Sequence, residues 1–122
     1  TTAKIYLNIN KSKFIQVIHN LLDNALAYTP INSKILIFVQ VVGYECIIHF
    51  VDQGPGISLT YKDKIFDRFY TDRSKNKKAH SGLGLSISKK IVESFGGSIN
   101  LINSSHLGFE GACFEIKLPL KD

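Results

Sequence analysis

The stretch SGLGLSISKKIVESFGG, residues 81–97, gives the strongest indication of the fold in this chain. A pair of glycines, Gly82 and Gly84, leads directly into an amphipathic segment that ends on a second pair, Gly96 and Gly97. Glycine lets a ligand approach the backbone closely, and the start of a helix offers unpaired N–H groups to a phosphate. The pattern also fits an ordinary packed helix with a glycine at its C-terminal cap. Two interpretations therefore stand: a phosphate-binding junction, or a purely structural helix.

The two common phosphate-binding fingerprints are absent from the sequence. No G-x-x-x-x-G-K-[ST] motif occurs, which excludes a Walker-type P-loop. The G-x-G of residues 82–84 continues to Ile87, where the dinucleotide-binding fingerprint needs a third glycine. A lysine-rich segment precedes it, whereas that fingerprint follows an apolar strand. A phosphate site here would belong to another class.

Length and composition indicate one domain, residues 1–122, with 44% hydrophobic and 20% charged residues. No apolar run approaches the roughly 20 residues that span a bilayer, and no signal-peptide pattern opens the chain. The absence of methionine suggests a piece of a longer protein. The net charge of +5 comes mostly from scattered basic residues without interleaved aromatics, so we expect no nucleic-acid partner. Cys46 and Cys113 lie in separate apolar runs, which predicts buried, reduced thiols and no zinc site.

Apolar periodicity predicts an α+β domain in which helices pack on one face of a mostly antiparallel sheet. Glycine and tyrosine at positions 43 and 44 separate two runs rich in β-branched residues, which indicates a hairpin. Strands are expected at residues 5–9, 34–42, 45–51, 98–103 and 112–118. Helices are expected from Asn10 or Ser12 to near Pro30 and over residues 85–95, and a short helix or helical turn is expected over residues 62–70.

Polar side chains on the first predicted helix point to a possible metal site. Gln16, Asn20 and Asn24 follow one side of this helix, opposite the apolar stripe centred on Leu21 and Ala25. Asparagine is a poor helix-interior residue because its amide competes for backbone hydrogen bonds. A solvated helix face would explain the pattern, and so would a carboxamide oxygen that ligates Mg²⁺ beside substrate phosphates.

Asp52 comes directly after the apolar strand IIHFV and before Gln53-Gly54-Pro55-Gly56. An ionised carboxylate only accepts hydrogen bonds, which suits an amino group such as adenine N6. An Asx-type turn is the structural alternative. Further along, Phe66, Phe69 and Tyr70 are expected to anchor the polar loop that follows them.

Four segments, taken in order, resemble the N, G1, F and G2 boxes of sensor histidine kinases: NLLDNALAYTP (20–30), DQGPGI (52–57), IFDRFY (65–70) and SGLGLSI (81–87). The tail IVESFGGSI…G..G..FEIKLP resembles the end of the same domain. The resemblance covers essentially the whole chain. It implies the catalytic and ATP-binding domain, a two-layer, Bergerat-type α/β sandwich with a mixed, mostly antiparallel sheet of about five strands and about three helices on one face.

The resemblance also implies roles for individual residues. Asn24 would ligate Mg²⁺, with Asn20 assisting one turn earlier, and Tyr28 would lie against the adenine or ribose. Asp52 would accept a hydrogen bond from adenine N6 in a pocket shaped by Gly54 and Gly56. Phe66 and Phe69 would anchor an ATP lid over residues 67–81. The glycines Gly82 and Gly84 would cradle the β- and γ-phosphates. The implied ATP-binding set is completed by Ile57, Arg68, Arg73, Ser81, Leu83 and Leu85.

Three positions depart from the family pattern. Ala27 stands where a lysine or arginine usually reaches the phosphates. Thr71 occupies a frequent arginine position, for which Arg68 or Arg73 would compensate. His80 replaces the first glycine of the usual G-x-G-L-G-L and is expected to restrict the hinge of the lid.

The implied activity is ATP–Mg²⁺ binding and transfer of the γ-phosphoryl group to a histidine on a separate dimerisation and phosphoacceptor domain, in two-component signalling. Asn20 stands where related ATPases have a glutamate general base, and an amide cannot take a proton. His19 lacks the phosphoacceptor context, so the fragment alone is expected not to label itself. Expected partners are the phosphoacceptor domain of a homodimeric parent and a cognate response regulator; the expected setting is the cytoplasmic side of an inner-membrane sensor kinase. A degenerate nucleotide-binding interaction module and an anti-sigma-factor-like serine kinase remain alternatives.

Overall fold

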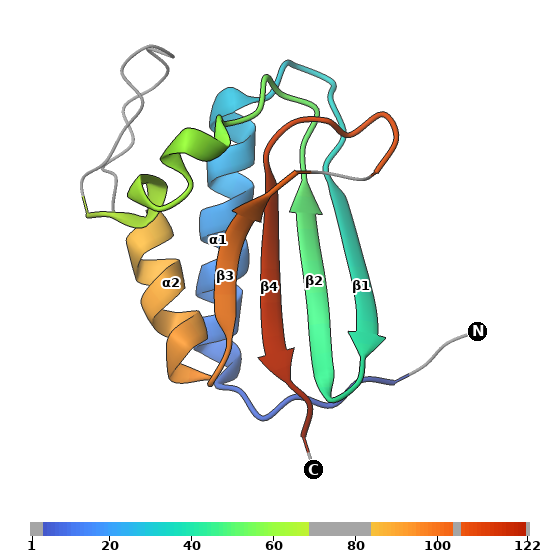
Figure 1. The fold of residues 1–122 in the computed structure, drawn as a ribbon, viewed down its shortest axis with the longest axis vertical. Helices are drawn as coiled ribbons and strands as arrows, with labels where there is room; N and C mark the ends of the chain where they lie inside the picture. The colour runs from blue at the N-terminus through green and yellow to red at the C-terminus, as the bar shows by residue number, and fades with distance from the viewer. Residues whose placement is uncertain (1–3, 69–83, 104–105, 122) are drawn as a thin grey trace.

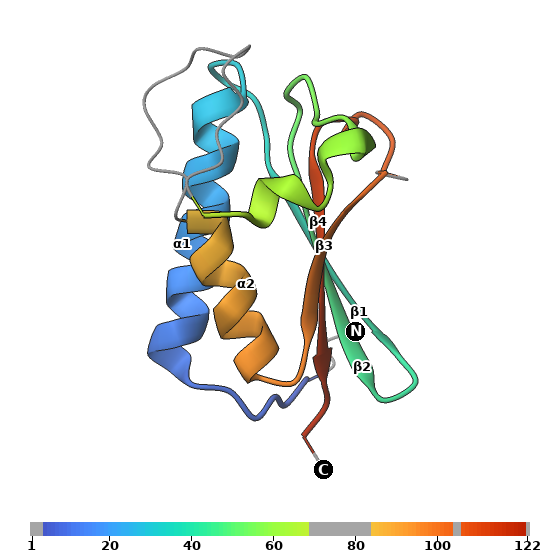
Figure 2. The same cartoon turned by 60° about the vertical axis from the view of Figure 1, so that its left-hand side comes forward.

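The computed structural model describes residues 4–68, 84–103 and 106–121, and it shows two layers (Figures 1 and 2). One layer holds the helices α1 (Lys11–Tyr28) and α2 (Gly84–Ser94). The other is a sheet of β1 (Leu36–Val42), β2 (Glu45–Val51), β3 (Ser98–Ile102) and β4 (Cys113–Pro119). Two 3-10 turns, η1 (Leu59–Tyr61) and η2 (Lys64–Phe66), lie on the connection between β2 and the second helix.

The four strands pair in the order β1-β2-β4-β3, and every pair is antiparallel. The register aligns Val39, Ile48, Ile116 and Ile99 in one row across the sheet. Because side chains alternate between the two faces of a strand, this row and its next-but-one neighbours form one apolar face. The helices cover the part of that face that β2, β4 and β3 form, and the core lies between the two layers, whereas Val39 on the edge strand β1 is 46% exposed.

The first helix shows how sequence sets local structure. Asn10 is the N-cap, and its side chain accepts a hydrogen bond from the backbone N–H of Lys13 at 3.1 Å. Val17 and Leu21, one helical turn apart, are almost completely buried against the sheet. The structure therefore confirms the predicted apolar stripe and chooses Asn10 over Ser12 as the cap.

Several sequence expectations were wrong in count or extent. The described residues contain four strands rather than five, an antiparallel rather than mixed sheet, and two α-helices rather than three. Residues 5–9 make only one isolated bridge, Leu7 to Leu120, because they meet just the last residues of the chain. For residues 62–70 the structure favours the helical turn over the short helix: the described part contains the 3-10 turn Lys64–Phe66, since so short a segment does not sustain an α-helix without a broad packed face.

Other expectations are confirmed. The hairpin turns at Gly43, whose φ is +61°, and Cys46 and Cys113 are buried free thiols. α2 ends as the glycine cap predicts: Gly96 has φ +80°, and the Gly97 N–H donates to the Val92 carbonyl at 3.1 Å. Within the described ranges, none of the helices has the length and apolar character needed to cross a membrane.

Candidate functional site

Four sequence motifs meet at one end of the sandwich. Figure 2 shows the connection that carries η1 and η2 running from the sheet layer towards the start of α2, above the gap between the layers. Asp52 follows the end of β2, and Asn20 and Asn24 lie on α1. The fold therefore places residues that are up to 64 positions apart in sequence at the same end of the molecule.

Asp52 is the most tightly held polar side chain at this end. It is only 5% exposed, and its Oδ1 accepts backbone N–H bonds from Gly54 at 2.9 Å and from Ala112 at 3.0 Å. No described residue donates to Oδ2. Among the described residues, both hydrogen bonds to this carboxylate therefore go to Oδ1. One carboxylate oxygen thus fixes the side chain, and the other is available to a ligand.

Burial has the largest effect on the pKa of Asp52. Loss of water around the carboxylate raises its pKa, and the two N–H bonds from Gly54 and Ala112 oppose that rise because they favour the charged form. The net result is a raised pKa. A hydrogen-bond donor that reached Oδ2 would relieve part of the cost of burying this charge.

Gly111 lets the loop before β4 close on Asp52. A Cβ at this position would stand 1.9 Å from Oδ1 of Asp52 and 2.8 Å from the backbone nitrogen of Gly54. The Gly111 N–H also donates to the Asp52 carbonyl at 3.1 Å. Gly56, at φ +79°, lies in ordinary contact range of the same loop. Gly111 is a site residue that was not predicted from the sequence; its place just before the last strand was the available signal.

Asn20 joins the two helices. Its Nδ2 donates to the carbonyl of Gly84 at 3.2 Å and to the hydroxyl of Ser88 at 3.1 Å. Asn24, one turn later on α1, is half-buried. Both asparagines therefore lie at the boundary between the core and the surface, and the first of them is not part of a simple solvated face.

Phe66 holds the connection above the site against the core. Its ring is 7% exposed and packs edge-on to Phe114, with the ring centroids 6.2 Å apart. Nζ of Lys89 on α2 lies 5.6 Å from the centroid of the Phe66 ring. This contact ties η2 to both the sheet and α2, as the expected anchor for the following loop requires. Ile57 and Leu85 are also packed against the core.

Several predicted site residues are not brought into view. Phe69, Arg73, Ser81, Gly82 and Leu83 lie outside the described residues, as do Thr71 and His80. The same holds for the side chain of Tyr28, although its backbone ends α1. Arg68 is exposed at the end of the described connection.

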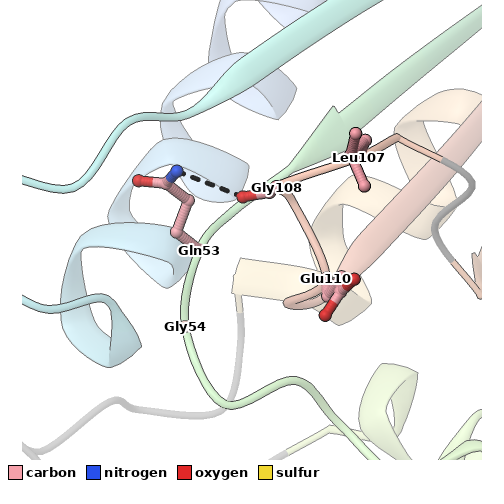
Figure 3. A pocket seen from close by; sticks show the side chains of 5 residues that line it. All are labelled: Gln53, Gly54, Leu107, Gly108 and Glu110. Atoms are coloured by element: carbon pink, nitrogen blue, oxygen red, sulfur yellow. Dashed lines mark hydrogen bonds between the residues drawn. The ribbon is translucent and has the colours of Figure 1, made fainter.

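A recess of about 460 Å³ opens beside the Asp52 loop, lined by Gln53, Gly54, Leu107, Gly108 and Glu110 (Figure 3). Gln53 spans it, with Nε2 donating to the Gly108 carbonyl at 3.1 Å and Oε1 accepting from the Lys34 N–H. Asp52 itself does not line the recess. The recess is therefore a surface feature next to the candidate site and does not define it.

A second polar cluster lies on the sheet face away from the helices, and the sequence analysis did not foresee it. Nδ1 of His49 lies 3.1 Å from Nε2 of His106, and Nε2 of His49 lies 3.1 Å from Oε2 of Glu115. These contacts attach the loop before β4 to the outer face. In the part of the chain that the structure describes, no group of three or more His, Cys, Asp or Glu side chains is arranged to hold a metal ion.

Comparisons with known proteins agree with this geometry. The family model described as histidine kinase-, DNA gyrase B-, and HSP90-like ATPase matches residues 9–122. Sensor protein KdpD of Clostridium acetobutylicum is 40% identical over 117 residues, which cover 94% of this chain and 13% of that protein. The chain thus spans about one eighth of the length of that curated relative.

Solved structures give the same result. The mycobacterial sensor histidine kinase MprB superposes with a TM-score of 0.81 at 26% identity, over 94% of this chain and 75% of that one. Histidine kinase ThkA, solved in complex with the response regulator protein TrrA, gives a TM-score of 0.74 at 30% identity, over 94% and 30% of the two chains.

Proposed function

This chain belongs to the family of histidine kinase-, DNA gyrase B- and HSP90-like ATPases, as a histidine-kinase catalytic domain, and we propose that it binds ATP with Mg²⁺ and transfers the γ-phosphoryl group to a histidine on a separate phosphoacceptor domain. The observation that carries the proposal is the fixed carboxylate of Asp52 at the end of β2. The Asn24 side chain and the start of α2 lie at the same end of the sandwich.

Asp52 supplies recognition of the base. Two backbone N–H groups hold Oδ1, so Oδ2 is left to accept from an exocyclic amino group, as in adenine. A base with a carbonyl oxygen at that position would set two acceptors against each other. Gly54 and Gly56 leave the adjoining backbone open to a flat ring.

The amide oxygen of Asn24 suits Mg²⁺, which prefers hard oxygen ligands and shares them with phosphates and water. Asn24 is half-buried on α1, so its side chain can reach a ligand at the boundary of the core. When bound, Mg²⁺ neutralises the charge that develops on the phosphates during transfer. The N–H groups at the start of α2 offer complementary positive dipoles to the same phosphates.

The polar groups around Asn20 favour transfer to a protein over hydrolysis. Asn20 contacts the Gly84 carbonyl and the Ser88 hydroxyl, and none of these three groups is a base of useful strength at neutral pH. The domain would act by positioning ATP and stabilising charge, while the nucleophile comes from the phosphoacceptor histidine.

The remaining partners follow from the rest of the parent protein. ThkA was solved with a response regulator protein, and we propose a cognate response regulator for the parent of this chain as well. The phosphoacceptor domain would form the homodimer, and any attachment to a membrane would come from segments outside this chain.

The test uses radiolabelled ATP with the purified domain, with and without the phosphoacceptor domain of the same parent. The domain alone should stay unlabelled, and the phosphoacceptor histidine should become labelled in the mixture. Asn24→Ala should abolish transfer, whereas Gln16→Ala, an exposed change on the same helix, should not.

Other outcomes favour other activities of the same fold. Tight ATP binding without any transfer would indicate a degenerate nucleotide-binding module. Acid-stable label on a serine would indicate a serine kinase. Strong labelling of the isolated domain would contradict the proposal.

A further inference from the structure

We propose that Asn20 is a positioning residue whose amide group fastens the start of α2 to α1, and so sets the phosphate-facing end of one helix relative to the magnesium-binding position on the other. This assignment rests on the proposed function. It differs from a direct contact between Asn20 and the nucleotide, because the group that acts is the NH₂ half of the side chain.

The neighbours of Asn20 fix which way its amide points. A backbone carbonyl only accepts hydrogen bonds, so the group 3.2 Å from the Gly84 oxygen must be the NH₂. The same nitrogen lies 3.1 Å from the Ser88 hydroxyl. Both amide hydrogens thus have acceptors on α2, one at its first residue and one a full turn later. The carbonyl oxygen is left as the free end of the side chain among the described residues.

Burial strengthens the hydrogen bonds between Asn20 and α2. Ser88 is completely buried, and Asn20 is half-buried, so water competes poorly for these bonds. The Gly84 carbonyl accepts both from Asn20 and, by helix geometry, from the N–H four residues later. Asn20 therefore donates to a carbonyl at the first residue of α2.

Packing against Asn20 does not explain the glycine at position 84. A Cβ there would lie 3.7 Å from the nearest atoms of Asn20, which is an ordinary contact distance. The two helices could accept alanine at this point. The start of α2 is thus held by a side-chain amide and not by close packing against Gly84. In the proposed function, the N–H groups of this turn face the phosphates.

The prediction is that loosening the bonds from Asn20 loosens only the start of α2. Ser88→Ala removes one acceptor and fits the same space. Ser94→Ala is the matched control, since the Ser94 hydroxyl donates only to Ile91 of its own helix. Asn20→Asp is the stronger variant, because it keeps the shape and sets a carboxylate oxygen against the Gly84 carbonyl.

The first measurement is amide hydrogen exchange on the nucleotide-free domain. In Ser88→Ala, the amides of residues 88–90 should exchange about two- to tenfold faster, which is the effect of one lost hydrogen bond, while residues 92–94 stay unchanged. Asn20→Asp should give a larger change in the same place. Ser94→Ala should leave residues 88–90 as in the wild type. Unchanged exchange there in both test variants would overturn the proposal.

The second measurement is the affinity for ATP–Mg²⁺ and for adenosine, by calorimetry. Ser88→Ala should weaken ATP–Mg²⁺ about two- to tenfold and leave adenosine within twofold, because adenosine has no phosphates to meet α2. Equal losses for both ligands would contradict a positioning role. If Asn24→Ala bound ATP–Mg²⁺ as tightly as the wild type, the proposed function would fail instead, and the exchange result would still decide the Asn20 contact.

Discussion

Gly111→Ala is the sharpest test of how the site is built, because the structure leaves no room for one methyl group. The new Cβ would stand 1.9 Å from Oδ1 of Asp52, where ordinary contact begins near 3.4 Å, so the loop or the carboxylate must move by about 1.5 Å. A shift of that size breaks the bond from Ala112 N–H to Oδ1 and the bond from Gly111 N–H to the Asp52 carbonyl. At about 1 kcal/mol for the neutral bond and about 1.5–3 kcal/mol for the charged one, the variant should lose about 2.5–4 kcal/mol of stability.

The assay is urea unfolding, read as a lower midpoint at unchanged slope, together with calorimetric titration of ATP. Nucleotide binding should disappear even under conditions where the variant is still folded, since the Asp52 carboxylate has lost its orientation. Gly84→Ala is the matched control: its Cβ would meet nothing closer than 3.7 Å, so its stability should change by less than about 0.5 kcal/mol. A Gly111→Ala protein within 0.5 kcal/mol of the wild type would refute this account of the Asp52 site.

Three further predictions concern pH, thiols and the α2 cap. Burial raises the pKa of Asp52, so the stability tied to that shift is present below the unfolded pKa near 3.9 and is lost as pH rises through the folded pKa. In urea titrations, Asp52→Asn should therefore be at least as stable as the wild type at pH 7, and the difference in stability should close towards pH 3.5. Its affinity for ATP should fall more than tenfold. Burial, with the nearby carboxylates of Glu115 and Asp52, raises the pKa of Cys113 to about 11, and burial also raises the pKa of Cys46. Iodoacetamide at pH 8 should therefore label neither thiol until urea unfolds the protein. Gly97→Ala would bring a Cβ to 2.1 Å from the Lys117 carbonyl and should cost at least about 2 kcal/mol in urea unfolding, because the exit from α2 can no longer meet β4.

Apolar periodicity predicted the elements whose structure depends on burying one face of a helix or strand. α1 could be predicted because the buried Val17 and Leu21 are one helical turn apart. β2 could be predicted because its run of β-branched residues is bounded by a glycine turn. The bounds of β2, Glu45–Val51, match the expectation to the residue. The same reasoning failed for residues 5–9, where alternation was present but only Leu120 was available as a bridge partner. Alternation shows that a segment can form a strand; pairing depends on neighbours that lie far away in sequence.

For the candidate site too, some residues could be predicted from the sequence and others could not. The sequence singled out Asp52 because a carboxylate follows an apolar strand directly. The structure shows it buried, and its bond from the Gly54 N–H is the one that the alternative Asx-type turn predicts, while its contact with a base stays a prediction. Its contacts with Gly111 and Ala112 could not be predicted, since these residues lie about 60 positions later and bind Asp52 through backbone N–H groups, which nearly every residue carries. Asn20 falls between these cases: its presence in a helix was a signal, but its contacts with α2 depend on how two helices pack.

The structural interpretation of residues 81–97 accounts for the glycines at one end of α2 and not for Gly84 at the other. At its exit, packing and backbone geometry account for both glycines: Gly96 has φ +80°, and a Cβ on Gly97 would collide with the Lys117 carbonyl. At its start, neither explanation is available for Gly84, whose Cβ would meet only ordinary contacts and whose φ lies outside the left-handed region. A glycine that the fold does not need is most simply explained by something that approaches from outside the fold. Because the Asn20 amide already holds the carbonyl of Gly84, the proposed phosphate contact at the start of α2 would fall to the backbone N–H groups of that turn.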